Sequence, residues 1–211
     1  MGSSLEEGFE MLTAGLGGQL AQEQLELSED ARLVGAARGG DRAAFGRLYD
    51  RYARMVHGIL LGKAPLAAVD DLVQDVFLLA LRRLSTLREI GSFGAWLAAI
   101  ARNLAKDHHR RSAPEQQLTV DVPEEEIEVR VSGGDQEDAA NLILDAIKSL
   151  PDAYREPLML RLVEGMTGPE IAARTGMTPG SVRVNLHRGM QQLRAMLSPS
   201  RGNPGQEGPE S

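Results

Sequence analysis

The side chains of residues 178–189, "TPGSVRVNLHRG", are of the types that bind nucleic acids. Arginine can donate two hydrogen bonds to a guanine edge, asparagine can pair with adenine, and both can bind phosphate oxygens. This pattern favours a helix that lies in the major groove of DNA; a plain helical hairpin with a solvated basic face is the alternative. Read as a helix, the stretch leaves five residues outside its apolar face: Arg183, Val184, Asn185, His187 and Arg188.

The residues before this helix carry the start and stop signals of a helix-turn-helix. Thr167 and Glu170 have the spacing of a capping box, in which each side chain bonds the other residue's backbone N–H. Gly176 suits the left-handed conformation that ends a helix, Thr178 can cap the next helix, and Pro179 fits its first position. The buried stripe expected along that second helix is Val182, Leu186, Met190, Leu193 and Leu197.

A second basic helix is predicted within "GSFGAWLAAIARNLAKDHHRR", from Ser92 onward. Such a helix could lie against a nucleic-acid backbone, or it could be a basic helix on an ordinary protein surface. His108 and His109 are adjacent and point in different directions on a helix, so no metal site is predicted. The polar side of this helix carries Arg102, Asn103, Lys106, His109 and Arg110.

An acidic helix is predicted from roughly Asp70 to Leu84, within "DDLVQDVFLLALRRL". Paired aspartates could indicate catalysis or a magnesium site, and contact with a partner is a further possibility. Acids in the first turn of a helix are favoured by its dipole, which explains them without chemistry. The residues expected to be buried are Leu72, Val73, Val76, Phe77 and Leu81.

The amino-acid composition limits which fold classes and which kinds of functional site are possible. The chain has 211 residues, 4% aromatic residues and no cysteine, which excludes disulfides and thiolate metal sites. β-Branched runs are few, so an all-α protein is predicted. We see no leader and no apolar run long enough to span a membrane, so a cytoplasmic protein without membrane insertion is expected.

Charge divides the chain into segments. The net charge of -7 hides a basic block, because residues 31–112 hold fourteen Lys and Arg against seven Asp and Glu. Two small helical domains joined by a flexible acidic linker are therefore predicted. The expected segments are a mobile acidic extension at 1–27, a helical domain at 28–112, the linker at 113–137, a helical domain at 138–198 and a disordered tail at 199–211.

Periodicity places further elements within these domains. A short helix should begin with Ser28 as its N-cap, with Glu29 and Asp30 in its first turn, and Gly39 and Gly40 should end it. Asp41 should cap the next helix, which Pro65 breaks. The apolar faces expected are Phe45, Leu48, Tyr52, Val56 and Ile59 on that helix, Phe93, Trp96, Leu97, Ile100 and Leu104 on the basic helix, and Ile143, Ile147 and Leu150 after the linker.

Several stretches, in their order along the chain, resemble the bacterial sigma-70 family, and most of all its extracytoplasmic-function group. "GDRAAFGRLYDRY", "DDLVQDVFLLAL" and "FGAWLAAIARNLAKDHHRR" are similar to sigma region 2. The stretch from "SLPDAYREPLMLRLVEG" to "SVRVNLHRGMQQLR" is similar to sigma region 4. The resemblance covers roughly residues 28–197.

The resemblance implies a factor that directs promoter-specific transcription initiation and is not an enzyme. Region 4 would bind the minus-35 element through Arg183, Val184, Asn185, His187 and Arg188. Region 2 would open and hold the minus-10 element through Arg102, Asn103, Lys106, His109 and Arg110. The β′ clamp coiled coil of core RNA polymerase would dock on Asp71, Leu72, Gln74, Asp75 and Val76.

The resemblance also implies further partners. Region 4 would touch the polymerase β flap, and an anti-sigma factor would hold the protein inactive. No cofactor is expected. Two alternative hypotheses remain. A stand-alone helix-turn-helix regulator would bind a palindromic duplex tightly without polymerase. An enzyme is the other alternative, but the sequence holds no P-loop and no Gly-rich dinucleotide turn.

Overall fold

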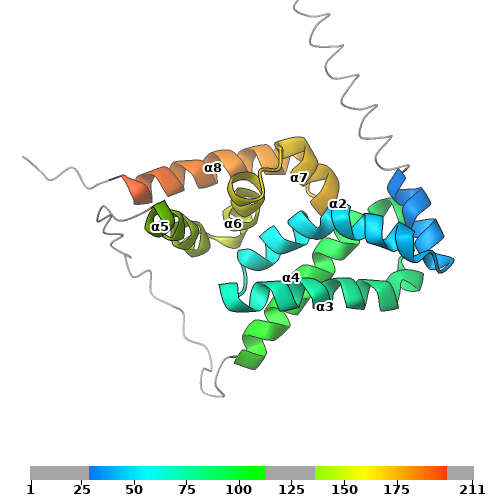
Figure 1. Ribbon diagram of the computed structural model, residues 1–211. Coiled ribbons are helices and arrows are strands. Elements are labelled where there is room, and N and C mark those ends of the chain that lie inside the picture. The colour runs from blue at the N-terminus through cyan, green and yellow to red at the C-terminus, as the bar shows by residue number, and fades with distance from the viewer. Residues whose placement is uncertain (1–28, 113–135, 199–211) are drawn as a thin grey trace, which may run out of the picture.

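The computed structural model describes residues 29–112 and 136–198, the side chains of 136–139 excepted. The predicted extension, the Ser28 cap, all of the linker but its last two residues, and the predicted tail lie outside the described residues. Within the described part every element is helical, which confirms the all-α prediction (Figure 1). The elements are a helix at 29–38, α2 (Arg42–Leu61), α3 (Leu66–Arg83), η1 (Leu84–Thr86), η2 (Ile90–Ser92), α4 (Phe93–Ser112), α5 (Gln136–Ser149), α6 (Asp152–Leu158), η3 (Met159–Val163), α7 (Gly168–Thr175) and α8 (Pro179–Leu197).

The first helical unit (residues 29–112) is a bundle of α2, α3 and α4. Asp41 caps α2 as predicted, since its Oδ1 accepts a hydrogen bond from the Ala44 backbone N–H at 3.0 Å. Aromatic rings join α2 to α4, where Tyr52 meets the fully buried Phe93 edge-on at a centroid distance of 5.2 Å. The predicted stripe along α2 is confirmed, because Leu48, Tyr52, Val56 and Ile59 are buried and Phe45 is partly buried.

The short helix at 29–38 is joined to α2 through a buried aspartate, Asp30. Asp30 is only 6% exposed, and it accepts a hydrogen bond from the Tyr52 hydroxyl and pairs with Arg51 at 3.1 Å. Burial, and then the neighbouring Asp30 carboxylate, raise the pKa of the Tyr52 hydroxyl. Asp30 therefore joins this helix to α2, a role beyond the dipole effect that the sequence predicted.

Helix α3 begins earlier than the sequence predicted. It starts at Leu66, directly after Pro65, because the missing N–H of proline is no loss at a helix start. Its first turn therefore holds no acid, and the dipole does not explain Asp70, Asp71 and Asp75. The expected burial of Leu81 is also wrong, since Leu81 is 47% exposed and Ala80 and Leu84 are buried in its place.

The second helical unit (residues 136–198) is built from α5 to α8. Its core includes Ala146, Ile147 and Leu150, whereas Ile143, which was expected in that stripe, is 42% exposed. The sequence did not predict the π-helical turn η3, which follows Pro157 and ends with a bond from the Glu164 N–H to the Met159 carbonyl at 3.2 Å. This wide turn leaves Leu162 and Val163 exposed while Met159 and Leu160 are buried.

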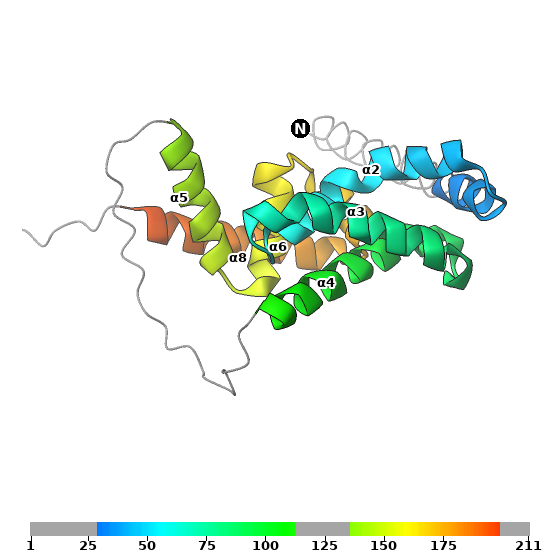
Figure 2. The same ribbon diagram turned by 60° about the horizontal axis from the view of Figure 1, so that its bottom comes forward.

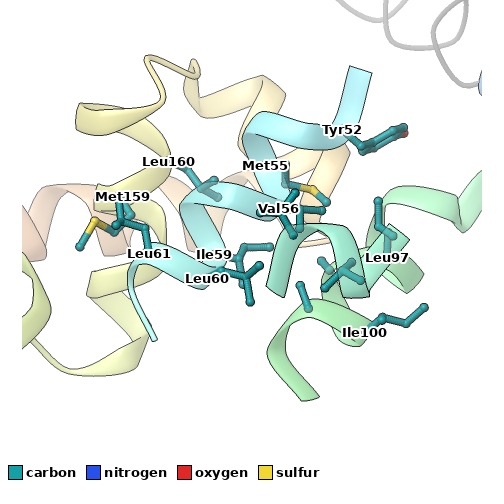
Figure 3. Close-up of a cluster of buried hydrophobic side chains, with 14 of the residues drawn as sticks. Tyr52, Met55, Val56, Ile59, Leu60, Leu61, Leu97, Ile100, Met159 and Leu160 are labelled. Carbon is teal, nitrogen blue, oxygen red and sulfur yellow. The ribbon is translucent and has the colours of Figure 1, made fainter. Parts of the chain in front are cut away.

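The two units pack against each other. The second half of α2 contacts η3 and α7, and α4 contacts α7. Both views of the ribbon place the units side by side, with α5 and the end of α8 away from the first unit (Figures 1 and 2). Figure 3 shows Met159 and Leu160 beside Leu61 and Ile59 of α2. One buried cluster thus runs through both units.

Candidate nucleic-acid interface

The turn between α7 and α8 has the geometry that the sequence predicted. The Thr167 Oγ1 accepts from the Glu170 N–H at 3.4 Å, and the Glu170 Oε2 accepts from the Thr167 N–H at 2.7 Å, which completes the capping box. Gly176 adopts a φ of 76°, the left-handed conformation that ends α7. These local contacts fix the direction in which the chain enters α8.

The capping box makes a pH-dependent contribution to stability. Hydrogen bonding from the Thr167 backbone N–H, together with its hydroxyl and Arg174, lowers the pKa of Glu170 below its usual 4.5. The charged carboxylate therefore stabilises the fold above the unfolded pKa, and this contribution is lost as the pH falls through the lower folded pKa.

Glu170→Gln tests this contribution, because glutamine keeps an oxygen acceptor and loses the charge. At about pH 6 we expect the variant to be less stable than the parent by roughly 0.3–1 kcal/mol. The difference should shrink toward zero at a pH below the lowered folded pKa of Glu170, where the parent's carboxyl is protonated too. Urea denaturation at both pH values measures it, and a difference that does not change with pH would contradict the role of the charge.

Helix α8 presents the residues predicted to bind the minus-35 element. Thr178 Oγ1 accepts from the Ser181 N–H at 3.2 Å, and Pro179 opens the helix, both as predicted. Val182 and Leu193 are buried, while Leu186, Met190 and Leu197 are partly buried against the core. Opposite that stripe Asn185 is half-buried, and Arg183, Val184, His187 and Arg188 are exposed.

The exposed cations of α8 are available to a ligand. Within residues 29–112 and 136–198, neither Arg183 nor Arg188 has a salt bridge or a side-chain hydrogen bond. Val184 lies between them in sequence and is 45% exposed. Its apolar side chain could contact a thymine methyl group. The outer face of α8 can therefore donate to phosphates and to base edges at once.

Helix α4 carries a second basic surface. Asn103, Lys106, His109 and Arg110 are exposed on it, and Arg110 bonds Asp107 at 2.7 Å. A groove of about 380 Å³ lies between α3 and α4 and is lined by Leu79, Arg83, Ile100, Asn103, Leu104, Lys106, Asp107 and Arg110. The structure thus brings Arg83, which sequence reasoning did not single out, to the same surface as three of the predicted residues.

Arg102 differs from the other predicted residues of α4. Its guanidinium forms a bidentate pair with Glu156 of α6, with Nε and one terminal nitrogen 3.0 and 2.7 Å from the carboxylate oxygens. Glu156 is only 4% exposed. Hydrogen bonding to Glu156 raises the pKa of Arg102 further, so the guanidinium stays charged. Arg102 therefore lies in the contact between the two units.

The residues of α3 that are predicted to bind polymerase fall into an exposed group and a buried group. Asp71, Gln74 and Asp75 are exposed and share one face. Leu72 and Val76 are 5% and 0% exposed, so they support this face from the core and offer no side-chain surface to a partner. Leu78, which sequence reasoning missed, is 51% exposed one turn further along the same face. Its spacing of three from Asp75 is the signal that could have found it.

Within residues 29–112 and 136–198, no three His, Cys, Asp or Glu side chains gather where a metal could bind. No helix in residues 29–112 or 136–198 has both the length and the apolar character needed to cross a membrane.

Comparisons with known proteins agree with the two-unit organisation. The family model for sigma-70 region 2 matches residues 48–115, and that for sigma-70 region 4 matches residues 140–193. The ECF RNA polymerase sigma factor BldN of Streptomyces coelicolor is 35% identical over 181 residues, which cover 81% of this chain and 67% of BldN. The RNA polymerase sigma factor CarQ of Myxococcus xanthus is 32% identical over 164 residues, 76% of this chain and 92% of CarQ.

A further relative and a solved structure extend the comparison. The ECF RNA polymerase sigma-E factor of Escherichia coli is 30% identical over 185 residues, 81% of this chain and 95% of that protein. The structure of CnrH in complex with the cytosolic domain of CnrY has a TM-score of 0.55 at 26% identity, and covers 80% of this chain and 97% of CnrH. Since both family models match in order, and relatives at 30% identity or more are covered over most of their length, the chain belongs to the extracytoplasmic-function sigma factors of the sigma-70 family.

Proposed function

We propose that this sigma factor directs core RNA polymerase to promoters by reading the minus-35 element with α8 and the minus-10 element with α4. The observation that carries the proposal is the capped α8, with Arg183 and Arg188 exposed on the face opposite its buried stripe. A helix held this way can enter the major groove, where arginine reads guanine and Asn185 can read adenine. His187 and Val184 complete that surface.

The minus-10 part of the proposal rests on the exposed face of α4. Asn103, Lys106, His109 and Arg110 are exposed there. Asn103 would contact a base, while the three basic residues would contact the backbone. Extruding a base from the stack takes a few kcal/mol, which contacts to the displaced strand must offset. The loop at 85–92 leads directly into α4 and supplies the neighbouring surface. Arg102 would join these residues once it leaves Glu156.

We place the polymerase contact on α3. Asp71, Gln74 and Asp75 form an exposed polar face that would dock on the β′ clamp coiled coil, with Leu78 as an apolar anchor at its end. Buried Leu72 and Val76 would hold the face in position. The second unit would touch the β flap. Polymerase then supplies much of the affinity for DNA, which explains why a chain of net charge -7 can read a promoter.

An anti-sigma factor is the regulatory partner that we propose, acting on the protein in the cytoplasm. The structure of the similar protein CnrH contains the cytosolic domain of a second protein, CnrY, and supports this part of the proposal. Pull-down of the tagged chain from its own cells, followed by loss of run-off activity on adding back the captured protein, would identify the partner. A captured protein that leaves initiation unchanged would contradict regulation by an anti-sigma factor.

Run-off transcription with bacterial core polymerase tests the function. We expect specific initiation only when the chain is added. Asn103→Ala should lower initiation by about fivefold, since one hydrogen bond to a base is worth roughly 1 kcal/mol. Asn141→Ala is the matched control, because Asn141 is an exposed asparagine on α5, away from both reading faces. Tight binding to a palindromic duplex, with no initiation and no core binding, would favour a stand-alone regulator instead.

A further inference from the structure

The helix at 29–38 ends beside the turn in which α3 passes into the loop at 85–92 (Figures 1 and 2). Its last residue, Arg38, donates from Nε to the backbone carbonyl of Leu84 at 3.0 Å, and from a terminal nitrogen to the carbonyl of Leu87. These two acceptors lie 46 and 49 positions further along the sequence. Arg38 therefore connects the first helix of the unit to the loop that precedes α4.

The two carbonyl groups that Arg38 binds stand where helical structure ends. Carbonyls at the end of a helix lack partners within the helix, so a side chain or water must supply the donor. The Leu84 carbonyl also accepts from the Leu87 N–H, at a long 3.3 Å. Arginine can serve both carbonyls because its donors project from one rigid planar fork, whereas lysine offers a single nitrogen on a flexible stem. The contact is thus specific to an arginine side chain.

The helix that carries Arg38 is itself firmly held. Its side chains Leu33, Val34 and Ala37 are at most 7% exposed and belong to the core of the first unit. The buried Asp30 at its other end accepts the hydrogen bond from Tyr52 of α2. Arg38 therefore reaches the loop from a fixed support, and its two hydrogen bonds transmit that support to the loop backbone.

The loop at 85–92 has little packing of its own beyond its first part. Leu87 is buried, and so is Phe93 at the start of α4, but the residues between them, 88–92, are exposed except for the half-buried Ile90. A Cβ placed at Gly91 would meet nothing within 4 Å. A segment with so few contacts opens readily unless its ends are anchored. The bond from Arg38 to the Leu87 carbonyl anchors the end nearer α3.

We propose that Arg38 is a positioning residue for promoter reading, which holds the loop at 85–92 in one conformation so that the loop and α4 present one surface to the minus-10 DNA. A loop that is ordered before binding has less conformational entropy to lose when it contacts DNA. Arg38 acts through the loop backbone, and its guanidinium donors are used there. This inference rests on the proposed function only in assigning the minus-10 DNA to α4 and the loop.

The first test measures whether Arg38 holds the loop in the full chain. Hydrogen–deuterium exchange, read by mass spectrometry, reports how often the backbone of each segment opens. Arg38→Ala should raise the exchange rate of peptides within 84–92 by about three- to tenfold, the factor expected for lost hydrogen bonds, while α2 exchanges as in the parent. Arg38→Lys should give an intermediate rate. Arg32→Ala is the matched control, because Arg32 is an exposed arginine on the same helix.

The second test measures whether the held loop matters for promoter reading. In run-off transcription on a promoter that the parent uses, Arg38→Ala should lower initiation by about three- to tenfold, and Arg38→Lys should restore part of it. Titration of fluorescently labelled chain with core polymerase should give the parent's affinity for both variants. Raising the variant's concentration should therefore leave the defect in place, whereas a merely unstable variant would lose core affinity as well.

Three results would overturn the inference. They are equal loop exchange in Arg38→Ala and Arg32→Ala, faster loop exchange with unchanged initiation, and equal losses of initiation and of core affinity. A parent chain that never initiates with core polymerase would instead contradict the proposed function, and the exchange experiment would still decide whether Arg38 holds the loop.

Discussion

Phe93→Ala is expected to lower the free energy of unfolding of the first helical unit by about 3–5 kcal/mol, since a buried phenylalanine leaves a cavity that the surrounding core fills only in part. Phe93 is fully buried at the start of α4. Its ring meets Tyr52 at 5.2 Å and Trp96 at 5.9 Å, so the substitution also removes two aromatic contacts. No other position in this unit combines so large a side chain with complete burial.

Denaturation in urea, followed through fluorescence, measures this change. Trp96 is the single tryptophan of the chain and lies beside Phe93, so its emission reports on this unit. Leu66→Ala is the control, because Leu66 is 60% exposed and its truncation should alter stability by no more than about 0.5 kcal/mol. A loss for Phe93→Ala as small as that of the control would mean that this core packs differently from the structure described.

Arg188→Ala is expected to weaken binding to the minus-35 element by about 1–3 kcal/mol, which corresponds to roughly 5–150-fold, because arginine at a base edge makes two hydrogen bonds. Arg188 is exposed on the outer face of α8, on the side away from buried Val182 and Leu193. A contact to a base also predicts lost discrimination between the minus-35 duplex and a scrambled duplex. Loss of a phosphate contact would instead weaken binding to both duplexes by the same factor.

Fluorescence anisotropy of the sigma factor bound to core polymerase, with the two duplexes in parallel, measures both quantities. Arg194→Ala is the matched control, since it removes the same charge from an exposed position nearer the end of the same helix. The control should change affinity slightly and leave discrimination intact. If Arg194→Ala and Arg188→Ala behave alike, Arg188 contributes only general charge and the proposed reading face of α8 is wrong.

Local signals in the sequence predicted the helix-turn-helix correctly. The capping box of Thr167 and Glu170, the left-handed Gly176 and the Thr178 cap all follow from hydrogen bonds between residues two to four positions apart. Such contacts depend on few neighbours and can be read from spacing alone. The exposed polar face of α8 follows for the same reason, since helical periodicity separates it from the stripe of Val182 and Leu193.

Periodicity was less reliable where tertiary packing selects which side of a helix is covered. Leu81 and Ile143 lie on apolar stripes and are nevertheless exposed, because no helix within residues 29–112 or 136–198 covers these side chains. Leu72 and Val76, which the resemblance assigned to the polymerase surface, are core residues within the same helix as exposed Asp71 and Asp75. The family resemblance suggests α3 as the helix that we propose to bind polymerase, and burial decides which of its side chains a partner can reach.

The sequence by itself determined the main α-helices, the caps at Asp41, Thr167 and Thr178, the polar faces of α4 and α8, and the family to which the chain belongs. Only the tertiary structure decided that Arg102 pairs with Glu156, that Gly58 admits Glu164 and Leu160, and that the two units share one core. These contacts join residues that are 54 and more than 100 positions apart. Their formation depends on how whole helices pack, and no local spacing in the sequence records that.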